Sequence, residues 1–331
     1  MITLGIETSC DETAAAVVEN GRVLSSVLAS QIPLHRPFNG VVPELAARAH
    51  LQKIAGIIDK ACKDAGSPPD IVAFTRGPGL MGPLLVGKVA AQTLADVIRC
   101  PLIGINHLEG HIFAVELSDR LEFPLIALVV SGGHTDLIFA RGPGLYKVLG
   151  RTRDDAAGEA FDKVARLLSL GFPGGPIIDK TARLGDPAAV PFPRPLMPET
   201  WDFSFSGLKT SVLYEWRKAG EKIPERLVPD WCASFQEAVV ETLATKAFKA
   251  AEKFGVRQVI LGGGVAANSR LRQIFKEWGE KKGFRVSMPP PSLCTDNGAM
   301  IAQAAFHRMK AGKLGRITAC DPSLSFQNWN S

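Results

Sequence analysis

Two histidines four residues apart carry the clearest chemical signal in the sequence. His107 and His111 lie in the run from Asn106 to Ala114, which directly follows the short apolar segment 101–105. Residues four apart on a helix lie on one face, about 40° apart around the axis. Two imidazoles placed in this way can bind one metal ion, although the same spacing also occurs in helices that bind none.

Asp296 is the candidate third ligand. It lies where the pattern predicts the start of a helix, so its carboxylate has the alternative role of N-cap. Two histidines and one carboxylate leave coordination positions open, as in catalytic zinc and Fe(II) sites. Glu109 lies two residues from each histidine and therefore roughly 200° around the helix, on the far face. This places Glu109 badly as a general base for a water on that metal.

Three loops rich in glycine or hydroxyl residues, 8–13, 131–135 and 262–268, each follow a predicted strand. Backbone N–H groups in such loops approach phosphate oxygens closely, and the third loop also opens a helix whose N-terminus favours anions. The loops indicate a nucleotide held between two domains, although glycine also serves tight turns. A further glycine-rich turn, 171–176, follows the helix that bears Asp162 and is placed to meet a ribose or a base edge.

The first of these loops contains two carboxylates, Asp11 and Glu12. They would repel a phosphate unless they are paired or engaged with an amine or hydroxyl of a substrate. The alternative is turn chemistry, since Asp favours such positions. We therefore treat both residues as candidate catalytic groups.

The elements that position these residues occur as a repeated pattern. A strand at 2–7, a polar loop, a strand at 14–18, an Asn20-Gly21 turn and a strand at 23–28 have a counterpart about 120 residues later, with strands at 125–130, 137–140 and 145–149. An Asn-Gly pair between apolar runs is typical of a hairpin. Two copies of one unit predict two related domains. Helices at 43–65, 83–98, 156–170, 233–254, 269–282 and 296–309 and strands at 71–75 and 256–261 complete an α/β pattern with mixed sheets.

Composition fits an ordinary globular enzyme. The 331 residues are 46% apolar and 21% charged, and this length suggests roughly two domains. No uncharged apolar run approaches the roughly 18 residues that cross a bilayer, and the start of the chain does not resemble a signal peptide. The six cysteines are scattered singly, as free thiols in a reducing cytoplasm are. The net charge of +5 permits an anionic partner without requiring one.

These motifs, in this order, resemble the TsaD family, the tRNA adenosine threonylcarbamoyltransferases once called O-sialoglycoprotein endopeptidases. The likeness runs from about residue 2 to 320 and includes the runs 5–13, 77–80, 106–111, 131–135, 158–163, 203–209, 262–268 and 295–298. It implies two actin-like (ASKHA, ribonuclease H-like) α/β domains with a nucleotide and metal cleft between them. We expect domain I at 1–106 plus about 297–325, and domain II with helical insertions at 107–296.

The resemblance also implies the site residues. The metal ligands would be His107, His111 and Asp296, holding one divalent ion per subunit, Fe(II) by preference with zinc as the alternative. Nine substrate contacts follow from the matching motifs: Val130, Ser131, Gly132, Gly133, His134, Asp162, Gly175, Asp179 and Asn268.

The implied reaction moves the threonylcarbamoyl group of threonylcarbamoyl-adenylate to the exocyclic amine of adenosine at tRNA position 37, in tRNAs that read codons beginning with adenine, and releases AMP. The implied partners are tRNA, a paralogue (TsaB) and an ATPase (TsaE), in the cytoplasm and without a membrane. The general base stays open between Asp11 and a metal-bound water. The rival functions are a metalloprotease, a small-molecule kinase of the same fold and a non-catalytic binding partner.

Overall fold

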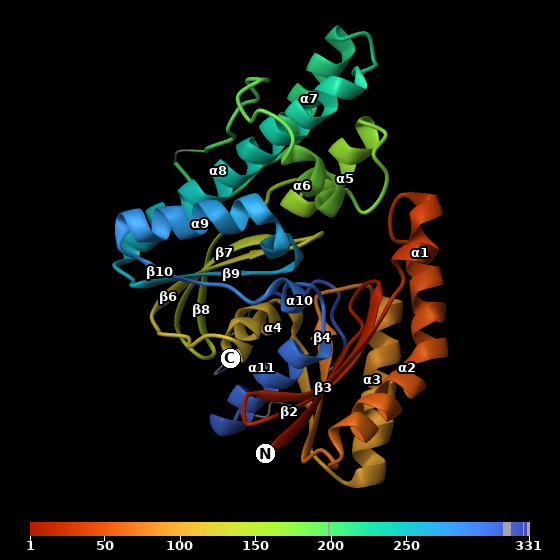
Figure 1. Ribbon diagram of the computed structural model, residues 1–331. Helices are drawn as coiled ribbons and strands as arrows, with labels where there is room; N and C mark the ends of the chain where they lie inside the picture. The colour runs from red at the N-terminus through yellow and green to blue at the C-terminus, as the bar shows by residue number, and fades with distance from the viewer. Residues whose placement is uncertain (198, 314–318, 327, 330–331) are drawn as a thin grey trace. The chain divides into compact units, whose positions relative to one another are not determined.

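The computed structural model describes residues 1–197, 199–313, 319–326 and 328–329. Its internal contacts divide the chain into two compact units (Figure 1): unit 1 is Met1–Arg120, Gly142–Tyr146 and Pro289–Ser331, and unit 2 is Leu121–Arg141 and Lys147–Met288. The predicted domain boundaries at 106 and 297 differ from this division. As a result, all three candidate metal ligands lie in unit 1, and not on opposite sides of a boundary.

The sheet of unit 1 has five strands in the order β3-β2-β1-β4-β5. They are β1 (Ile2–Glu7), β2 (Glu12–Glu19), β3 (Arg22–Ser30), β4 (Ile71–Gly77) and β5 (Leu102–Asn106). β1 pairs antiparallel with β2 and parallel with β4. The predicted hairpin is confirmed, since Asn20 and Gly21 both have positive φ, as a two-residue turn between twisted strands requires.

The sheet of unit 2 repeats this plan in the order β10-β9-β6-β7-β8. Its strands are β6 (Leu125–Val130), β7 (Thr135–Gly142), β8 (Leu145–Arg151), β9 (Gln258–Gly262) and β10 (Arg285–Ser287). β6 pairs antiparallel with β7 and parallel with β9, as β1 does with β2 and β4. The duplication and the α/β class with mixed sheets are therefore confirmed.

Helices line both sides of the unit 1 sheet (Figure 1), with α2 (Pro43–Ala65) and α3 (Met81–Ile98) along one side and α4 (His107–Ala114) and α11 (Gly298–Lys310) along the other. Short helices α1 (Ile32–His35) and α10 (Pro291–Cys294) lie in the connections. Among the described residues, α3 alone is long and apolar enough to cross a membrane. α3 carries Lys88 and Asp96 and packs against α2 and β4. A helix packed within a globular domain can have the same length and apolar composition, so these two properties are weak evidence for a membrane span.

Unit 2 has α5 (Ala157–Leu167), α6 (Gly174–Ala182), α7 (Ser206–Lys218), α8 (Val228–Phe254) and α9 (Ser269–Lys282). The sequence pattern did not predict α6 or α7. α7 buries only Leu208 and Val212, so its apolar stripe is weak. α6 opens with two glycines, which the pattern assigns to a turn.

Candidate metal centre and nucleotide loops

The two histidines lie at the start of α4, as predicted. The Asn106 side chain caps this helix by accepting hydrogen bonds from the backbone N–H groups of Leu108 (2.9 Å) and Glu109 (3.3 Å). His107 and His111 are both buried, and their ring centroids lie 4.7 Å apart. The predicted common face is therefore confirmed.

Asp296 is not the N-cap of the following helix. Asn297 caps α11 instead, with its Oδ1 accepting from the backbone N–H of Met300 at 2.9 Å. Asp296 Oδ1 faces the two rings, at 3.5 Å from His107 Nε2 and 3.3 Å from His111 Nε2. The capping alternative for Asp296 is therefore wrong, and its carboxylate is directed toward the histidines.

Close packing fixes α4 and α11 in this position. A Cβ on Gly5 in β1 would lie 2.1 Å from the carbonyl oxygen of Gly298, so only glycine lets the start of α11 come this near the sheet. Gly110 also lets α4 pack against α11, although less tightly, since its Cβ would lie 3.0 Å from Ile301 Cδ1 at the end of a side chain. Asp296 lies two residues before this clamped helix start, and its position follows from the clamp.

The donor set fits one divalent ion. One ligand atom from each of His107, His111 and Asp296 lies within 4.8 Å of the others. Ligands about 2.1 Å from a shared ion lie about 3 to 3.5 Å apart at ordinary coordination angles, which matches the two carboxylate–imidazole distances. Neither ring nitrogen of buried His111 makes a hydrogen bond. A buried polar atom without a partner is costly, and an ion would supply that partner.

The charges of this cluster also favour a cation. Burial alone would lower the pKa of His107, but the carboxylates of Asp296 and Glu7 outweigh it and raise this pKa to about 9. Burial lowers the pKa of His111, which keeps that imidazole neutral and able to act as a ligand. Burial, and then the charge of Asp296, raise the pKa of Asp11. Such a concentration of carboxylates repels phosphate.

The loop between β1 and β2 therefore differs from the predicted phosphate loop. The Thr8 hydroxyl donates to the carbonyl of Pro83, 2.9 Å away. Glu12 Oε1 accepts from the Ser30 hydroxyl at 2.8 Å, and burial raises the pKa of Glu12 to about 7. Asp11 and Glu12 are both partly buried, so both remain candidates for contact with a substrate.

The predicted substrate loops converge within unit 2. Val130 ends β6, and the turn after it is closed by hydrogen bonds between the Ser131 N–H and the His134 carbonyl (2.8 Å) and between the His134 N–H and Ser131 Oγ (3.2 Å). A Cβ on Gly158 would lie 2.6 Å from the Ser131 carbonyl oxygen, so the start of α5 packs directly on this turn. A Cβ on Gly263, after β9, would lie 2.3 Å from the Val130 carbonyl oxygen. The turn after β6, the start of α5 and the loop after β9, which are far apart in sequence, therefore lie in direct contact.

Polar side chains connect the remaining loops to this cluster. Asp162 accepts from the backbone N–H of Gly174 at 2.7 Å, at the start of α6. Asp179 on α6 accepts from the N–H and the hydroxyl of Ser269 at 3.1 and 2.7 Å, at the start of α9. Asn268 caps α9 through its Oδ1. Asp162 thus holds the start of α6, and Asp179, in the second half of α6, holds the start of α9; the N-terminal amides of both helices can donate to an anion.

Four glycines in these loops are not required by the protein itself. A Cβ added to Gly132, Gly133, Gly175 or Gly264 meets nothing within 4 Å, and none of the four has a left-handed φ. Packing and backbone strain therefore do not explain glycine there. The absence of a side chain leaves the backbone N–H groups at these positions open to close approach by a ligand.

A family model described as tRNA N6-adenosine threonylcarbamoyltransferase (TsaD) matches residues 22–303. The chain belongs to the TsaD family. It is 55% identical to the tRNA N6-adenosine threonylcarbamoyltransferase of Symbiobacterium thermophilum, over 94% of this chain and 92% of that protein. The Bacillus cereus protein of the same name is 49% identical, with 98% and 97% covered. Family membership makes the chain a transferase that acts on tRNA.

Solved structures agree with the actin-like fold of this TsaD-family chain. A full-length HypF in its phosphate- and nucleotide-bound form aligns with a TM-score of 0.62 and 14% identity, over 93% of this chain and 55% of that chain. The ROK hexokinase of Thermus thermophilus aligns with a TM-score of 0.51 and 17% identity, over 94% and 100%. At such identities the likeness shows the fold alone.

The structure places two further residues beside the TsaD-type motifs that the sequence pattern did not indicate as site residues. Gln236 on α8 is buried and accepts from the Asn268 side-chain amide at 2.7 Å. Glu7, at the end of β1, is fully buried beside His107. Glu7 lies inside a motif that the sequence shows, but its burial as a carboxylate at a strand end was not visible in the pattern.

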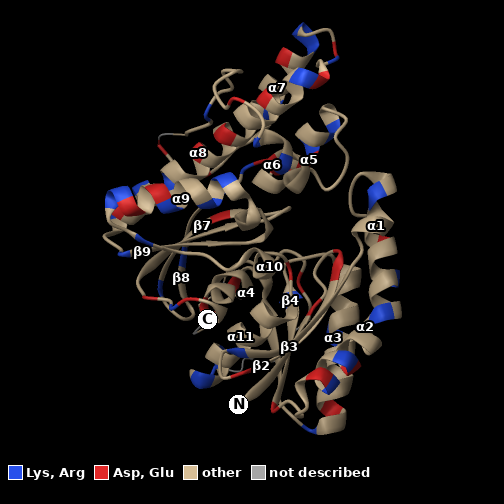
Figure 2. Ribbon diagram, viewed as in Figure 1, with Lys and Arg blue, Asp and Glu red and all other residues tan. Residues whose placement is uncertain are grey.

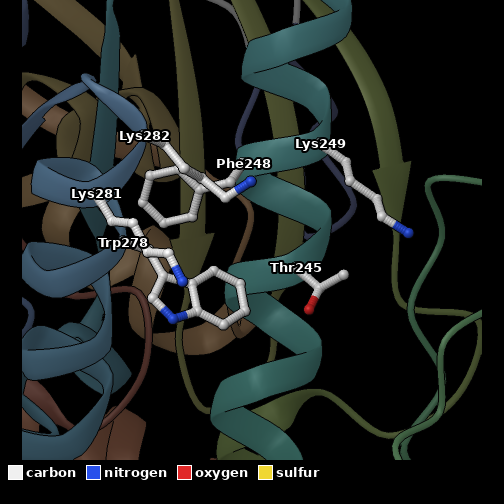
Figure 3. Close-up of a pocket in the computed structure, with 6 residues that line it drawn as sticks. All are labelled: Thr245, Phe248, Lys249, Trp278, Lys281 and Lys282. Carbon is white, nitrogen blue, oxygen red and sulfur yellow. The ribbon is translucent and has the colours of Figure 1, made fainter.

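A pocket of about 480 Å³ lies between α8 and α9 and is lined by Thr245, Phe248, Lys249, Trp278, Lys281 and Lys282 (Figure 3). α9 rises about 1.5 Å per residue, so Lys282 at its end lies about 20 Å from the loop at its start. Lys282 pairs with Glu252 at 2.6 Å, and basic and acidic residues alternate along this end of α9 (Figure 2). The pocket is therefore separate from the nucleotide loops.

Proposed function

We propose that this chain transfers the threonylcarbamoyl group of threonylcarbamoyl-adenylate to the exocyclic amine of adenosine 37, in tRNAs that read codons beginning with adenine. The observation that carries the proposal is the His107, His111 and Asp296 donor set in a chain of the TsaD family. The rival readings lack such support. Glu109, which a metalloprotease would need beside its metal, is fully buried away from the rings and is bonded to Tyr146, Arg308 and Trp329.

The metal is assigned to unit 1 and is Fe(II), with zinc as the alternative. When bound, it supplies a Lewis acid that polarises a substrate oxygen. His107 and His111 hold it from α4, and Asp296 holds it from the segment before α11.

The adenylate is assigned to the loops of unit 2. The turn 130–134 and the helix starts at Gly175 and Asn268 present backbone amides to its phosphate, with Gly132 and Gly133 allowing close approach. Asp162 and Asp179 fix the starts of α6 and α9, and their remaining acceptor capacity suits ribose hydroxyls. A departing phosphate is stabilised by the same amides that bind it.

In the transfer step, the adenosine amine nitrogen forms a bond to the carbamoyl carbon while the bond from that carbon to the phosphate oxygen breaks. AMP leaves with the electron pair, and the amine loses one proton. We assign that proton to Asp11, since a pKa raised by burial and by Asp296 makes its carboxylate a better base. Glu12 supports this loop from the first position of β2 through Ser30.

The further partners belong to the same proposal. The donor is supplied by a separate synthase, and a paralogue (TsaB) and an ATPase (TsaE) assemble with the chain in the cytoplasm. The tRNA enters through its anticodon loop, where a flat base is exposed for recognition.

Reconstitution tests this function. Purified chain, partners, synthase, threonine, bicarbonate, ATP and tRNA are combined with metal, and the digested tRNA is analysed by mass spectrometry for threonylcarbamoyladenosine. We expect product with wild type and with the exposed α9 variant Glu280→Ala, and none with Asp296→Ala. Absence of product from metal-replete wild type would refute the proposal. Glycoprotein cleavage that His107→Ala abolishes would favour the protease instead, and ATP turnover on a sugar that His111→Ala leaves intact would favour the kinase.

A further inference from the structure

Glu7 is a carboxylate that the reaction itself does not use. It ends β1 and is fully buried. Its Oε1 accepts from the backbone N–H of Ser9 at 2.5 Å, and its Oε2 accepts from the Thr75 hydroxyl at 2.5 Å. Burial of a charged carboxylate is costly unless it is hydrogen-bonded and paired with an opposite charge.

The side chain that faces Glu7 is one of the candidate metal ligands. Glu7 Oε2 lies 3.0 Å from His107 Nδ1, and in the described part of the chain no other basic side chain lies within ion-pair distance of Glu7. The other nitrogen of the same ring, Nε2, faces Asp296. His107 therefore lies between two carboxylates, one on the side of the donor set and one behind it.

The second histidine is held differently. His111 Nε2 faces Asp296 Oδ1 at 3.3 Å, but His111 Nδ1, on the other side of the ring, has no hydrogen-bond partner. A hydrogen bond from Nδ1–H to a carboxylate fixes both the tautomer and the ring plane of a ligating histidine, and it makes Nε2 a stronger donor. Only His107 has this support.

We infer that Glu7 is a positioning residue, which holds the proton of His107 on Nδ1 and so directs Nε2 to the metal. This inference rests on the proposed metal site. It adds that His107 would be the anchoring ligand and that Glu7, which faces Nδ1 and not Nε2 of the His107 ring, would set the affinity of the donor set.

The test is metal binding by the purified full-length chain, stripped with a chelator and titrated with Co²⁺ or Zn²⁺. Replacement of such a supporting carboxylate typically weakens metal affinity about 10- to 100-fold, and we expect this decrease for Glu7→Gln, whose amide oxygen is a weaker acceptor, with a shifted Co²⁺ absorption spectrum. Glu237→Gln is the matched control, because it is the same substitution of a buried carboxylate in unit 2, where Glu237 pairs with Arg270. We expect Glu237→Gln to change metal affinity less than about threefold, because Glu237 shares no partner with the donor set.

A second measurement does not depend on the variant folding. In Zn²⁺-loaded wild type with ¹⁵N-labelled histidine, NMR should find His107 protonated at Nδ1 and ligated through Nε2. Ligation through Nδ1, or a Glu7→Gln affinity within twofold of wild type, overturns the inference and leaves the proposed metal site standing. Wild-type binding that His111→Ala does not weaken overturns both.

Discussion

Removal of the Glu109 side chain tests how α4 is anchored. Its carboxylate is fully buried and accepts from Tyr146 Oη at 2.8 Å, Trp329 Nε1 at 2.6 Å and Arg308 Nη2 at 3.0 Å. These donors come from the start of β8, the C-terminal segment and α11, so one residue connects three distant parts of unit 1 to the helix that carries both histidines. Loss of this carboxylate should therefore loosen the whole unit.

The magnitude follows from what Glu109→Ala leaves behind. Arg308 loses its partner while its side chain is only 16% exposed, and breaking a buried pair in this way costs about 3 to 5 kcal/mol. The hydrogen bonds from Tyr146 and Trp329 to the carboxylate are worth about 1.5 to 3 kcal/mol each, but their loss overlaps with that of the pair. We therefore expect the free energy of unfolding of unit 1 to fall by about 3 to 5 kcal/mol in all.

Urea unfolding followed by circular dichroism and tryptophan fluorescence measures this loss, with Arg308→Ala and the double variant completing a cycle. We expect a coupling energy of about 1 to 3 kcal/mol between the two sites, because the side chains are in direct contact. A Glu109→Ala protein that unfolds within about 1 kcal/mol of wild type would refute the anchoring role. If the losses of stability in Glu109→Ala and Arg308→Ala simply add up in the double variant, the two side chains do not stabilise each other and the pairing is refuted.

Two further predictions concern unit 2. Burial raises the pKa of Asp136 to about 6, so the folded state holds a proton that the unfolded chain releases near its ordinary pKa, and stability falls as pH rises from about 4 to 6. Asp136→Asn should remove this dependence and raise stability at pH 7 by at most about 3 kcal/mol, as thermal unfolding across pH 4–8 would show; an unchanged pH profile would contradict it. Gly133→Ala should leave thermal stability within about 0.5 kcal/mol, since its Cβ meets nothing, yet weaken adenylate binding in calorimetry; unweakened binding would remove Gly133 from the substrate site.

The periodic parts of the fold were predictable from the sequence. Strands β1 and β6, and helix α2 from Pro43 to its end before Gly66, follow from apolar runs and end signals that act locally. β10 has only three residues, which is too short for alternation to be visible. The sequence pattern thus predicts a helix or strand when the element is long enough to show its periodicity and one of its faces is buried.

For the candidate metal site, the sequence indicates the residue types and their spacing but not their geometry. Asp and Asn are nearly equal as N-caps, so the sequence could not decide whether Asp296 or Asn297 begins α11. The contact between Gly5 and Gly298, almost 300 residues apart, decides it, and leaves the Asp296 carboxylate for the histidines. If α11 began one residue earlier, Asp296 would be its N-cap and its carboxylate would not face the histidines. Tertiary packing, and not the local sequence, therefore decides the role of Asp296.

The distribution of charge also supports the proposed assignment of the metal to unit 1 and of the adenylate to unit 2. Around His107, the carboxylates of Glu7, Asp11 and Asp296 make unit 1 attractive to a cation and repellent to phosphate. The loops of unit 2 instead present helix N-termini and open glycines, while Asp162 and Asp179 are already engaged with backbone N–H groups. A metal and an acyl adenylate have opposite electrostatic needs, and two copies of one fold satisfy both because each copy fills the same loops with different residues.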